Sequence, residues 1–281
     1  QLLEKARKQV AYQASHGSSQ RMLDRQEAIA IEPALAHLGS ALAGCVYTPT
    51  EEVGDCHLFT TELFKQIQAH PAASVHTGAQ VVRLQTRQGR VTGAQLDNGN
   101  IVEADHFVVA NGLQGYDLLK KHGLTVPLYG LRGYSLSIPL PPDPPAGHTG
   151  TPPAAPSISV TDYERRIVYA RLGSLLRIAA MVDIGDSSSG INRSRIRHLK
   201  SEVLKSFPEL TVDQAKEWAG DRPATPDGKP IIDRSRRFEN LWLNLGHGAL
   251  GFTLACGSAV LLHALMTRGQ GTIDATPFGI R

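Results

Sequence analysis

The sequence is poor in the residues that build disulfide frameworks and metal centres. It has three cysteines among 281 residues, Cys45, Cys56 and Cys256, and none of them stands in a C-x-x-C pair. An odd number of widely spaced cysteines favours reduced thiols in a cytoplasmic protein over a disulfide-stabilised secreted domain. The eleven histidines show neither H-x-x-x-H nor H-E-x-x-H spacing, so no metal site is expected.

Long apolar runs and long runs of one charge are also missing. No stretch of 18 apolar residues occurs, so we expect no segment that spans a membrane. The net charge of +3 is spread along the chain, except for four basic residues between Arg193 and Lys200. We interpret that cluster as the solvated face of a helix, and no nucleic-acid partner is expected. The length suits one large or two ordinary domains.

Helical and strand patterns are interleaved along the chain. Helical patterns occur at 1–14, 24–37, 58–70 and 193–206. Strand patterns occur at 74–76, 80–86, 90–96, 101–103, 107–110, 157–161, 167–170, 175–182, 215–218 and 241–245. The short apolar segments 107–110 and 241–245 are typical of strands that are buried in a parallel sheet, whereas others alternate as antiparallel strands do. This mixture predicts an α+β (mixed α/β) fold with two domains that exchange segments.

The last quarter of the sequence contains a glycine turn. The apolar segment 241–245 leads into Gly246-His-Gly-Ala-Leu-Gly251, and a helix is predicted from Phe252 to about Met266. The glycines spell G-x-G-x-x-G, but the dinucleotide fingerprint also needs a second parallel strand with an acidic residue about 20 positions on. No such strand follows here. We therefore interpret the segment as a turn that opens a helix, whose free N–H groups can hold an anionic or electron-rich ligand edge.

Arg222 is the strongest single candidate for ligand binding. It lies between Gly220-Asp221 and Pro223, which predicts irregular backbone. From such backbone a planar guanidinium can be aimed into a cavity and can bind a carboxylate through two hydrogen bonds. On spacing alone, the favoured alternative is a structural ion pair with Asp221, Asp227 or Asp233.

Two motifs resemble the FAD-dependent amine oxidases of the D-amino acid oxidase superfamily, and most closely the small subunit of the bacterial D-amino acid dehydrogenases. The pattern W-x-G-x-R-P-x-T-P-D-G occurs at Trp218–Gly228, and G-H-G-x-L-G-[WF]-T occurs at Gly246–Thr253. Further matches at Gly54–Thr60, Phe107–Gly112 and Leu131–Leu136 extend the resemblance over nearly the whole chain. The family's amino-terminal βαβ unit, which holds the FAD pyrophosphate, has no counterpart here. We therefore expect an N-terminally truncated member.

The resemblance implies a two-domain, FAD-linked reductase of the D-amino acid oxidase type. Residues 1–56 and 126–220 would form the substrate-binding domain, and residues 57–125 and 221–281 the FAD-binding domain. The implied activity is oxidative deamination of a D-amino acid, or of a related amino acid, by hydride transfer to the flavin. The electrons would pass to a quinone or another respiratory acceptor, which implies a cytoplasmic protein at the periphery of the inner membrane.

The resemblance also assigns roles to individual residues. It makes Arg222 the ligand of the substrate carboxylate and places Tyr134 over the substrate or the flavin, although a tyrosine on such a strand is more often a core residue. The backbone of Gly251, Phe252 and Thr253 would donate to the flavin O2 region. The other residues implied in cofactor binding are Val81, Ala110, Asn111, Gly112, Gly246, His247 and Gly248. For His247, packing and flavin contact stay equal alternatives.

Two other interpretations of the function stay open. One is an enzyme of the glycine, sarcosine or opine oxidase kind, which would differ in what fills the pocket beyond the carboxylate. The other is a non-catalytic fragment, because a chain without the phosphate-binding turn needs a separate βαβ-bearing chain to hold FAD.

Overall fold

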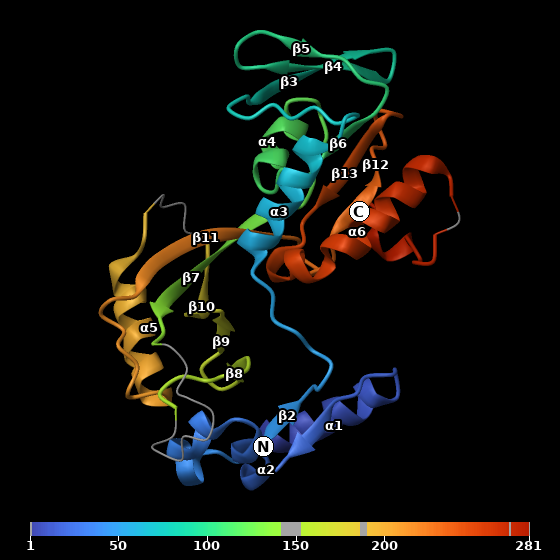
Figure 1. Cartoon of the computed structure of the whole chain (residues 1–281). Coiled ribbons are helices and arrows are strands. Elements are labelled where there is room, and N and C mark those ends of the chain that lie inside the picture. The colour runs from blue at the N-terminus through green and yellow to red at the C-terminus, as the bar shows by residue number, and fades with distance from the viewer. Residues whose placement is uncertain (1, 142–152, 186–189, 270, 281) are drawn as a thin grey trace. The chain divides into compact units, whose positions relative to one another are not determined.

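Helices and strands alternate along the chain (Figure 1). The computed structural model describes residues 2–141, 153–185, 190–269 and 271–280. The chain forms two compact units. Unit 1 consists of Gln1–Asp55, Gly133–Met181 and Ser188–Ala219, and unit 2 of Cys56–Arg132, Val182–Ser187 and Gly220–Arg281. The mixture of helices, antiparallel strand pairs and a parallel strand pair confirms the predicted α+β class.

Unit 1 contains a two-stranded sheet and most of a five-stranded sheet. The strand orders are β1-β2 and β11-β7-β10-β9-β8. The elements are α1 (Leu2–Ala14), β1 (Arg21–Leu23), α2 (Arg25–Ile31), η1 (Pro33–Ala41), β2 (Cys45–Tyr47), β7 (Tyr129–Pro139), β8 (Val160–Asp162), β9 (Ile167–Leu172), β10 (Leu175–Ile184), α5 (Arg193–Ser206) and β11 (Lys216–Ala224). Of these, β7, β10 and β11 continue into unit 2.

The helix α5 covers the core of unit 1 with one face only. Its residues Ile196, Leu199 and Val203 are buried and belong to the same cluster as Leu136 and Ile178 of the sheet. The opposite face carries the basic cluster of residues 193–200, whose arginines are exposed, as predicted for a solvated helix face. A helix with one apolar stripe is stabilised mainly by such packing.

The helical pattern at 24–37, in which Pro33 is an interruption, forms two helices that are separated at Glu32. The helix α2 ends at Ile31, Glu32 has extended backbone, and Pro33 begins the 3-10 helix η1. A proline disfavours helical backbone at the residue before it. The Glu32 carboxylate is 1% exposed and accepts hydrogen bonds from the backbone N–H groups of Ala34, Ser157 and Ile158 and from the Ser157 hydroxyl. These bonds compensate the burial of its charge.

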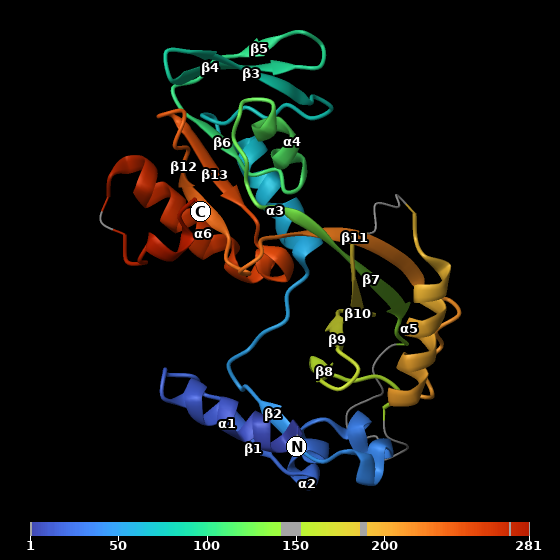
Figure 2. The ribbon, with the colours of Figure 1, turned by 180° about the vertical axis from the view of Figure 1, so that it is seen from behind.

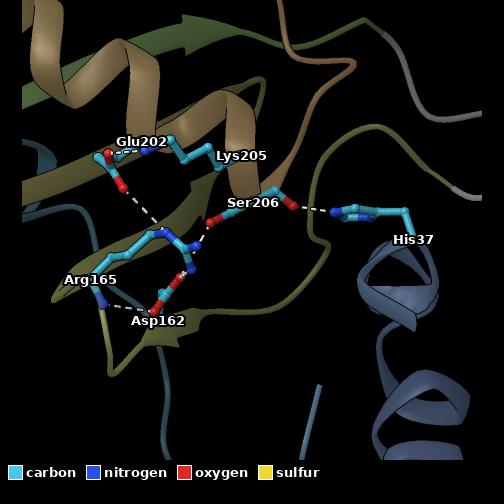
Figure 3. A network of polar contacts seen from close by, with 6 residues as sticks. All are labelled: His37, Asp162, Arg165, Glu202, Lys205 and Ser206. Carbon is cyan, nitrogen blue, oxygen red and sulfur yellow. Dashed lines mark hydrogen bonds and ion pairs between the residues drawn. The ribbon is translucent and has the colours of Figure 1, made fainter. Parts of the chain in front are cut away.

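A polar network holds the end of α5 to the turn between β8 and β9 (Figure 3). Arg165 binds Asp162 at 2.9 Å and Glu202 at 3.3 Å, and the Ser206 hydroxyl donates to Asp162. Burial acts to raise the pKa of the Asp162 carboxyl, but the hydrogen bonds and the charge of Arg165 outweigh it and lower that pKa. The network therefore connects α5 to the turn between β8 and β9 through charged contacts.

Unit 2 contains two three-stranded sheets, with the orders β12-β13-β6 and β3-β4-β5. Its elements are α3 (Cys56–Ala69), β3 (Val81–Arg87), β4 (Arg90–Leu96), β5 (Ile101–Val102), β6 (Phe107–Val109), α4 (Gln114–Lys120), β12 (Ile231–Arg234), β13 (Leu241–Leu245), η2 (Gly248–Leu250), α6 (Gly251–Thr267) and η3 (Thr276–Phe278). The strand predicted at 74–76 is wrong, since those residues form no regular structure.

The strand β13 is buried on both faces, which explains its unbroken apolar sequence. Leu241, Leu243 and Leu245 belong to a core cluster with the residues of α4, whereas Trp242 packs with α6 in a second cluster. The strand pairs antiparallel to β12 and parallel to β6. Both views show α6 lying along this sheet (Figure 1, Figure 2). The prediction that these two short apolar segments are strands of the parallel-sheet type is confirmed, and the structure shows that they pair with each other.

The expectation about membrane spans needs one correction. The segment Gly248–Thr267 is long and apolar enough, by length and composition, to cross a membrane, with a mean hydropathy of 1.8. A search for unbroken apolar runs misses this segment, because Thr253, Ser258 and His263 lie among its apolar residues. In this structure its buried residues Leu261 and Leu262 pack against the sheet of unit 2.

Asn240 joins the two sheets of unit 2. Its buried side chain accepts a hydrogen bond from the Val91 N–H and donates to the carbonyl groups of Val91 and Asp105, at 2.8–2.9 Å. Val91 lies on β4, and Asp105 precedes β6. The side-chain amide of Asn240 therefore connects the two sheets through hydrogen bonds, although their strands do not pair with each other.

We predict that Asn240→Ala lowers the free energy of unfolding by about 2–4 kcal/mol, because it leaves buried backbone groups without partners. Urea denaturation of both proteins measures the difference. Asn98→Ala is the matched control: Asn98 is exposed and accepts only from the Asn100 N–H, so its effect should stay below about 1 kcal/mol. Equal losses in the two variants would contradict the assignment of Asn240.

Candidate functional site

The predicted strand, turn and helix at residues 241–266 are confirmed. β13 ends at Leu245, the turn passes through η2, and α6 begins at Gly251. Gly246 and Gly248 have φ of +82° and +56°. A Cβ atom at Gly246 would lie 2.6 Å from Cγ2 of Thr225. Both backbone conformation and space therefore require glycine at Gly246.

The amino end of α6 has no side-chain cap. Leu250 stands at the N-cap position and makes no capping hydrogen bond. Phe252 and Thr253 are exposed in the first turn, and Gly251 is half-buried. The first N–H groups of a helix have no partner within the helix and carry its positive dipole end. This end of α6 therefore fits an electron-rich or anionic ligand edge, which is the chemistry expected of the flavin pyrimidine.

Arg222 lies within β11, so the prediction of irregular backbone around it is wrong. Its strand is the outermost of the five-stranded sheet, and an edge position tolerates Pro223 because no ladder hydrogen bond is lost there. The side chain is half-buried, and burial lowers the pKa of its guanidinium. A carboxylate ligand would relieve that cost.

Two of the three carboxylates considered as partners of Arg222 are engaged elsewhere. Asp221 accepts from Nη1 of the buried Arg132, at 3.1 and 3.3 Å. Asp233 accepts from the backbone N–H groups of Arg234 and Ile280. The match at Leu131–Leu136 contains Arg132. Spacing alone did not reveal the pairing of Arg132 with Asp221, because the two residues are 89 positions apart.

The structure brings the strand of Arg222 next to the glycine turn. Ala224 forms an isolated antiparallel bridge with His247. Because a strand rises roughly 3.3 Å per residue, the Cα atom of Arg222 lies about 7 Å from that of Ala224. Both segments belong to unit 2. That Arg222 and the residues Gly251–Thr253 face one cavity stays a prediction.

His247 is tied to the packing of α6. Its Nε2 atom lies 3.0 Å from the hydroxyl oxygen of Ser258, which is buried on the helix. The imidazole is half-buried, and burial lowers its pKa. This contact gives His247 a structural role in holding the turn against α6, and a flavin contact stays a prediction.

The residues predicted to lie near the adenosine sit at two places in unit 2. Ala110 and Asn111 are exposed after β6, and Gly112 has φ of +63° where the chain turns into α4. Val81 is exposed at the first position of β3. These positions are accessible, and their roles stay predictions.

Tyr134 lies in the core of unit 1. It is 1% exposed and belongs to the cluster that includes Leu136 and Ile178. That environment matches the core role that a tyrosine on such a strand usually has. Its contact with a substrate or flavin stays a prediction. Among the described residues, no group of three or more metal-ligating side chains occurs.

Sequence reasoning missed the apolar surface of unit 2. The helix α3 has no buried residue, and its exposed apolar side chains are those of Leu58, Phe59, Leu63, Phe64 and Ile67. Phe59 contacts Phe252 of α6 edge to face, with ring centroids 5.6 Å apart. The apolar content of residues 58–67 was visible in the sequence, but nothing in it showed that these side chains would be exposed.

Comparisons with known proteins agree on one family. The model of the family described as FAD dependent oxidoreductase matches residues 1–265. The chain is 43% identical over 260 residues to D-amino acid dehydrogenase 2 of Pseudomonas aeruginosa, covering 92% of this chain and 59% of that protein. It is 42% identical over 280 residues to D-amino acid dehydrogenase 2 of Ralstonia nicotianae, covering 98% and 64%. The chain thus spans about three-fifths of the length of these relatives.

Solved structures show the same fold. The glycine oxidase of Geobacillus kaustophilus superposes with a TM-score of 0.82 at 21% identity, over 99% of this chain and 71% of that one. The L-proline dehydrogenase of P. horikoshii superposes with a TM-score of 0.81 at 17% identity, over 99% and 72%.

The lowered pKa of His247 predicts how the turn responds to pH. Because the folded state favours the neutral imidazole, the stability that it contributes is complete above the unfolded pKa of about 6.5 and is lost as the pH falls through the lower folded value. We expect NMR titration, with the signal assigned from His247→Gln, to give a pKa below 6.5. Ser258→Ala should keep it low, because burial is the cause. Titration at or above 6.5 would contradict this assignment.

Proposed function

The chain belongs to the family of FAD-dependent oxidoreductases, and from that premise we propose that it is the substrate-binding and flavin-edge part of an enzyme that oxidatively deaminates D-amino acids. The names of the relatives at 43% and 42% identity support the substrate class. The single observation that carries the proposal is the bridge between Ala224 and His247, which joins the strand of Arg222 to the uncapped end of α6.

Arg222 would bind the substrate carboxylate. Its guanidinium is half-buried, so an ion pair there is screened less than on the surface. Two parallel hydrogen bonds from the guanidinium fork would fix both carboxylate oxygens and so the direction of the Cα–H bond. The pairing of Asp221 with Arg132 keeps one neighbouring carboxylate from competing for this position.

The first turn of α6 would hold the flavin. The backbone N–H groups of Gly251, Phe252 and Thr253 supply donors and a positive dipole end where negative charge develops on the pyrimidine edge. When bound, FAD supplies the acceptor for the hydride that leaves the substrate Cα atom. The substrate amine in its neutral form assists that departure, so the residues of this chain need only bind, orient and exclude water.

A dehydrogenase is favoured over the oxidase alternatives. The relatives at 43% and 42% identity are named dehydrogenases, whereas the likeness to glycine oxidase, at 21% identity, shows the fold alone. We propose a quinone or another respiratory acceptor for the electrons, which requires a cytoplasmic protein at the periphery of the inner membrane.

The FAD-binding unit also needs further polypeptide. Unit 2 exposes the apolar side chains of α3, and Val108 on β6 is 43% exposed. Among the described residues, no strand pairs with the free edge of β6. An open edge on a parallel strand and an exposed apolar helix fit a βαβ segment, whose strand would extend the sheet and whose helix would cover α3. About two-fifths of the Pseudomonas relative lies outside the match and has the length to supply it.

We predict that Arg222→Leu lowers kcat/KM for D-amino acids by roughly 10–150-fold, the equivalent of a charge-assisted interaction of about 1.5–3 kcal/mol. The measurement uses this chain fused to the part of the Pseudomonas relative that lies outside the match. FAD content should not change, because Arg222 holds substrate and not cofactor. Arg234→Leu, at an exposed position on β12, is the matched control. An unchanged kcat/KM in Arg222→Leu would show that the residue is structural.

We also predict that the 281-residue chain by itself holds no stoichiometric FAD, since it supplies no glycine-rich turn for the pyrophosphate. Mixing the 281-residue chain with a βαβ segment supplied by the Pseudomonas relative should restore a flavin absorbance band and turnover. Val108→Lys should block this recovery by placing a charge at the docking edge, whereas Ile101→Lys, on the exposed strand β5, should not. Isothermal titration of the isolated chain with FAD decides, and micromolar or tighter binding would overturn the requirement for a partner segment.

A further inference from the structure

One face of the unit 1 sheet carries polar side chains that the proposed mechanism does not use. Along β7, the side chains of Tyr134, Leu136 and Ile138 enter the core. Because successive side chains of a strand point to opposite faces, Ser135 and Ser137 leave β7 on the other side. On β10, Leu176, Ile178 and Ala180 are likewise core residues, so Arg177 leaves on that other side.

Three of these side chains meet across three neighbouring strands. Trp218, Ser137 and Arg177 lie on three strands that are neighbours in the order β11-β7-β10. The guanidinium of Arg177 lies over the indole ring of Trp218, with its Cζ atom 5.5 Å from the ring centroid. Its Nη1 atom donates a long hydrogen bond of 3.5 Å to the Ser137 hydroxyl. Trp218 is 50% exposed.

Arg177 has no carboxylate within ion-pairing distance among the described residues. By contrast, Arg165 and Arg193 of unit 1 each form an ion pair with at least one carboxylate. Arg177 is half-buried, so part of its hydration is lost without an anion to replace it. Stacking on Trp218 holds the plane of the guanidinium but leaves the N–H groups at its edge free to donate.

Ser135 supplies a second, independent observation. It is 3% exposed, and its hydroxyl has no hydrogen-bond partner among the described residues. A buried hydroxyl without a partner costs about 1–3 kcal/mol and is rare in folded proteins. Ser135 and Ser137 are two positions apart on one strand, so their side chains leave the same face of the sheet.

We propose that Arg177, Trp218, Ser137 and Ser135 form a carboxylate-binding subsite on unit 1, which takes a carboxylate at the end of a methylene chain, such as that of glutarate or of the side chain of D-glutamate. The guanidinium would bind the side-chain carboxylate, and the serine hydroxyls would donate to its oxygens. The indole would pack against the methylene groups. Only the identification of the ligand as a substrate rests on the proposed function, because the carboxylate chemistry stands on the cluster itself.

Tryptophan fluorescence tests the subsite without flavin or turnover. The chain has two tryptophans, and Trp242 is buried in unit 2. In Trp242→Phe, the remaining signal comes from Trp218, and D-glutamate and glutarate should change it saturably. D-norvaline, which has a similar length and no second carboxylate, should not. Arg177→Gln should weaken the apparent affinity for glutarate at least about tenfold, as loss of a charge-assisted contact requires.

Control variants distinguish binding at this cluster from a general effect of removing a positive charge. Arg197→Gln removes an exposed arginine of α5 and should leave the glutarate titration unchanged, whereas Ser137→Ala should weaken it by a smaller factor than Arg177→Gln. Far-UV circular dichroism of each variant checks that it folds. An unsaturable glutarate response, or equal affinities in Arg177→Gln and the parent protein, would overturn the subsite.

A second measurement distinguishes failure of the subsite from failure of the proposed function. In the fused holoenzyme, turnover of D-alanine is measured beside the glutarate titration, which itself requires neither flavin nor turnover. Saturable glutarate binding without turnover of any D-amino acid would keep the subsite and reject the proposed activity. Turnover of D-alanine without glutarate binding would keep the activity and reject the subsite.

Discussion

The parallel pairing of β13 with β6 is the constraint on which the candidate site depends. It fixes the direction in which β13 leaves the sheet, and burial on both faces fixes its register. Gly246 then turns the chain where no other residue fits, and α6 begins within six residues of the strand. The bridge from His247 to Ala224 adds β11 to the same place. A shift in the register of one of these strands would separate Arg222 from the amino end of α6.

Local patterns of the sequence predicted the parts of this arrangement that depend on neighbouring residues. The bounds of β13 and α5 were predicted exactly at 241–245 and 193–206 because apolar periodicity, glycine and proline act locally. The strand around Arg222 was missed because Gly220 and Pro223 lower strand propensity, and only the sheet order shows that an edge position tolerates them. The bridge between Ala224 and His247 joins segments whose sequence contains no signal for their pairing.

The arginines of the chain illustrate why residue type alone does not identify a ligand site. Arg132 is buried and paired with Asp221, so its charge is compensated within the protein. Arg165 lies in a network with two carboxylates. Arg177 meets an aromatic ring and a hydroxyl, neither of which neutralises its charge. What distinguishes a site for an anion is therefore a desolvated guanidinium whose countercharge the fold does not provide.

The exposed helix α3 links the stability of unit 2 to its function. A 14-residue helix is marginal in water, and most helices gain their stability by packing an apolar face. Here the apolar side chains of α3 are exposed, apart from the contact of Phe59 with Phe252. Phe252 also stands in the first turn of α6, beside the N–H groups assigned to the flavin. Polypeptide that covers α3 would therefore also restrain the first turn of α6 through the same aromatic pair.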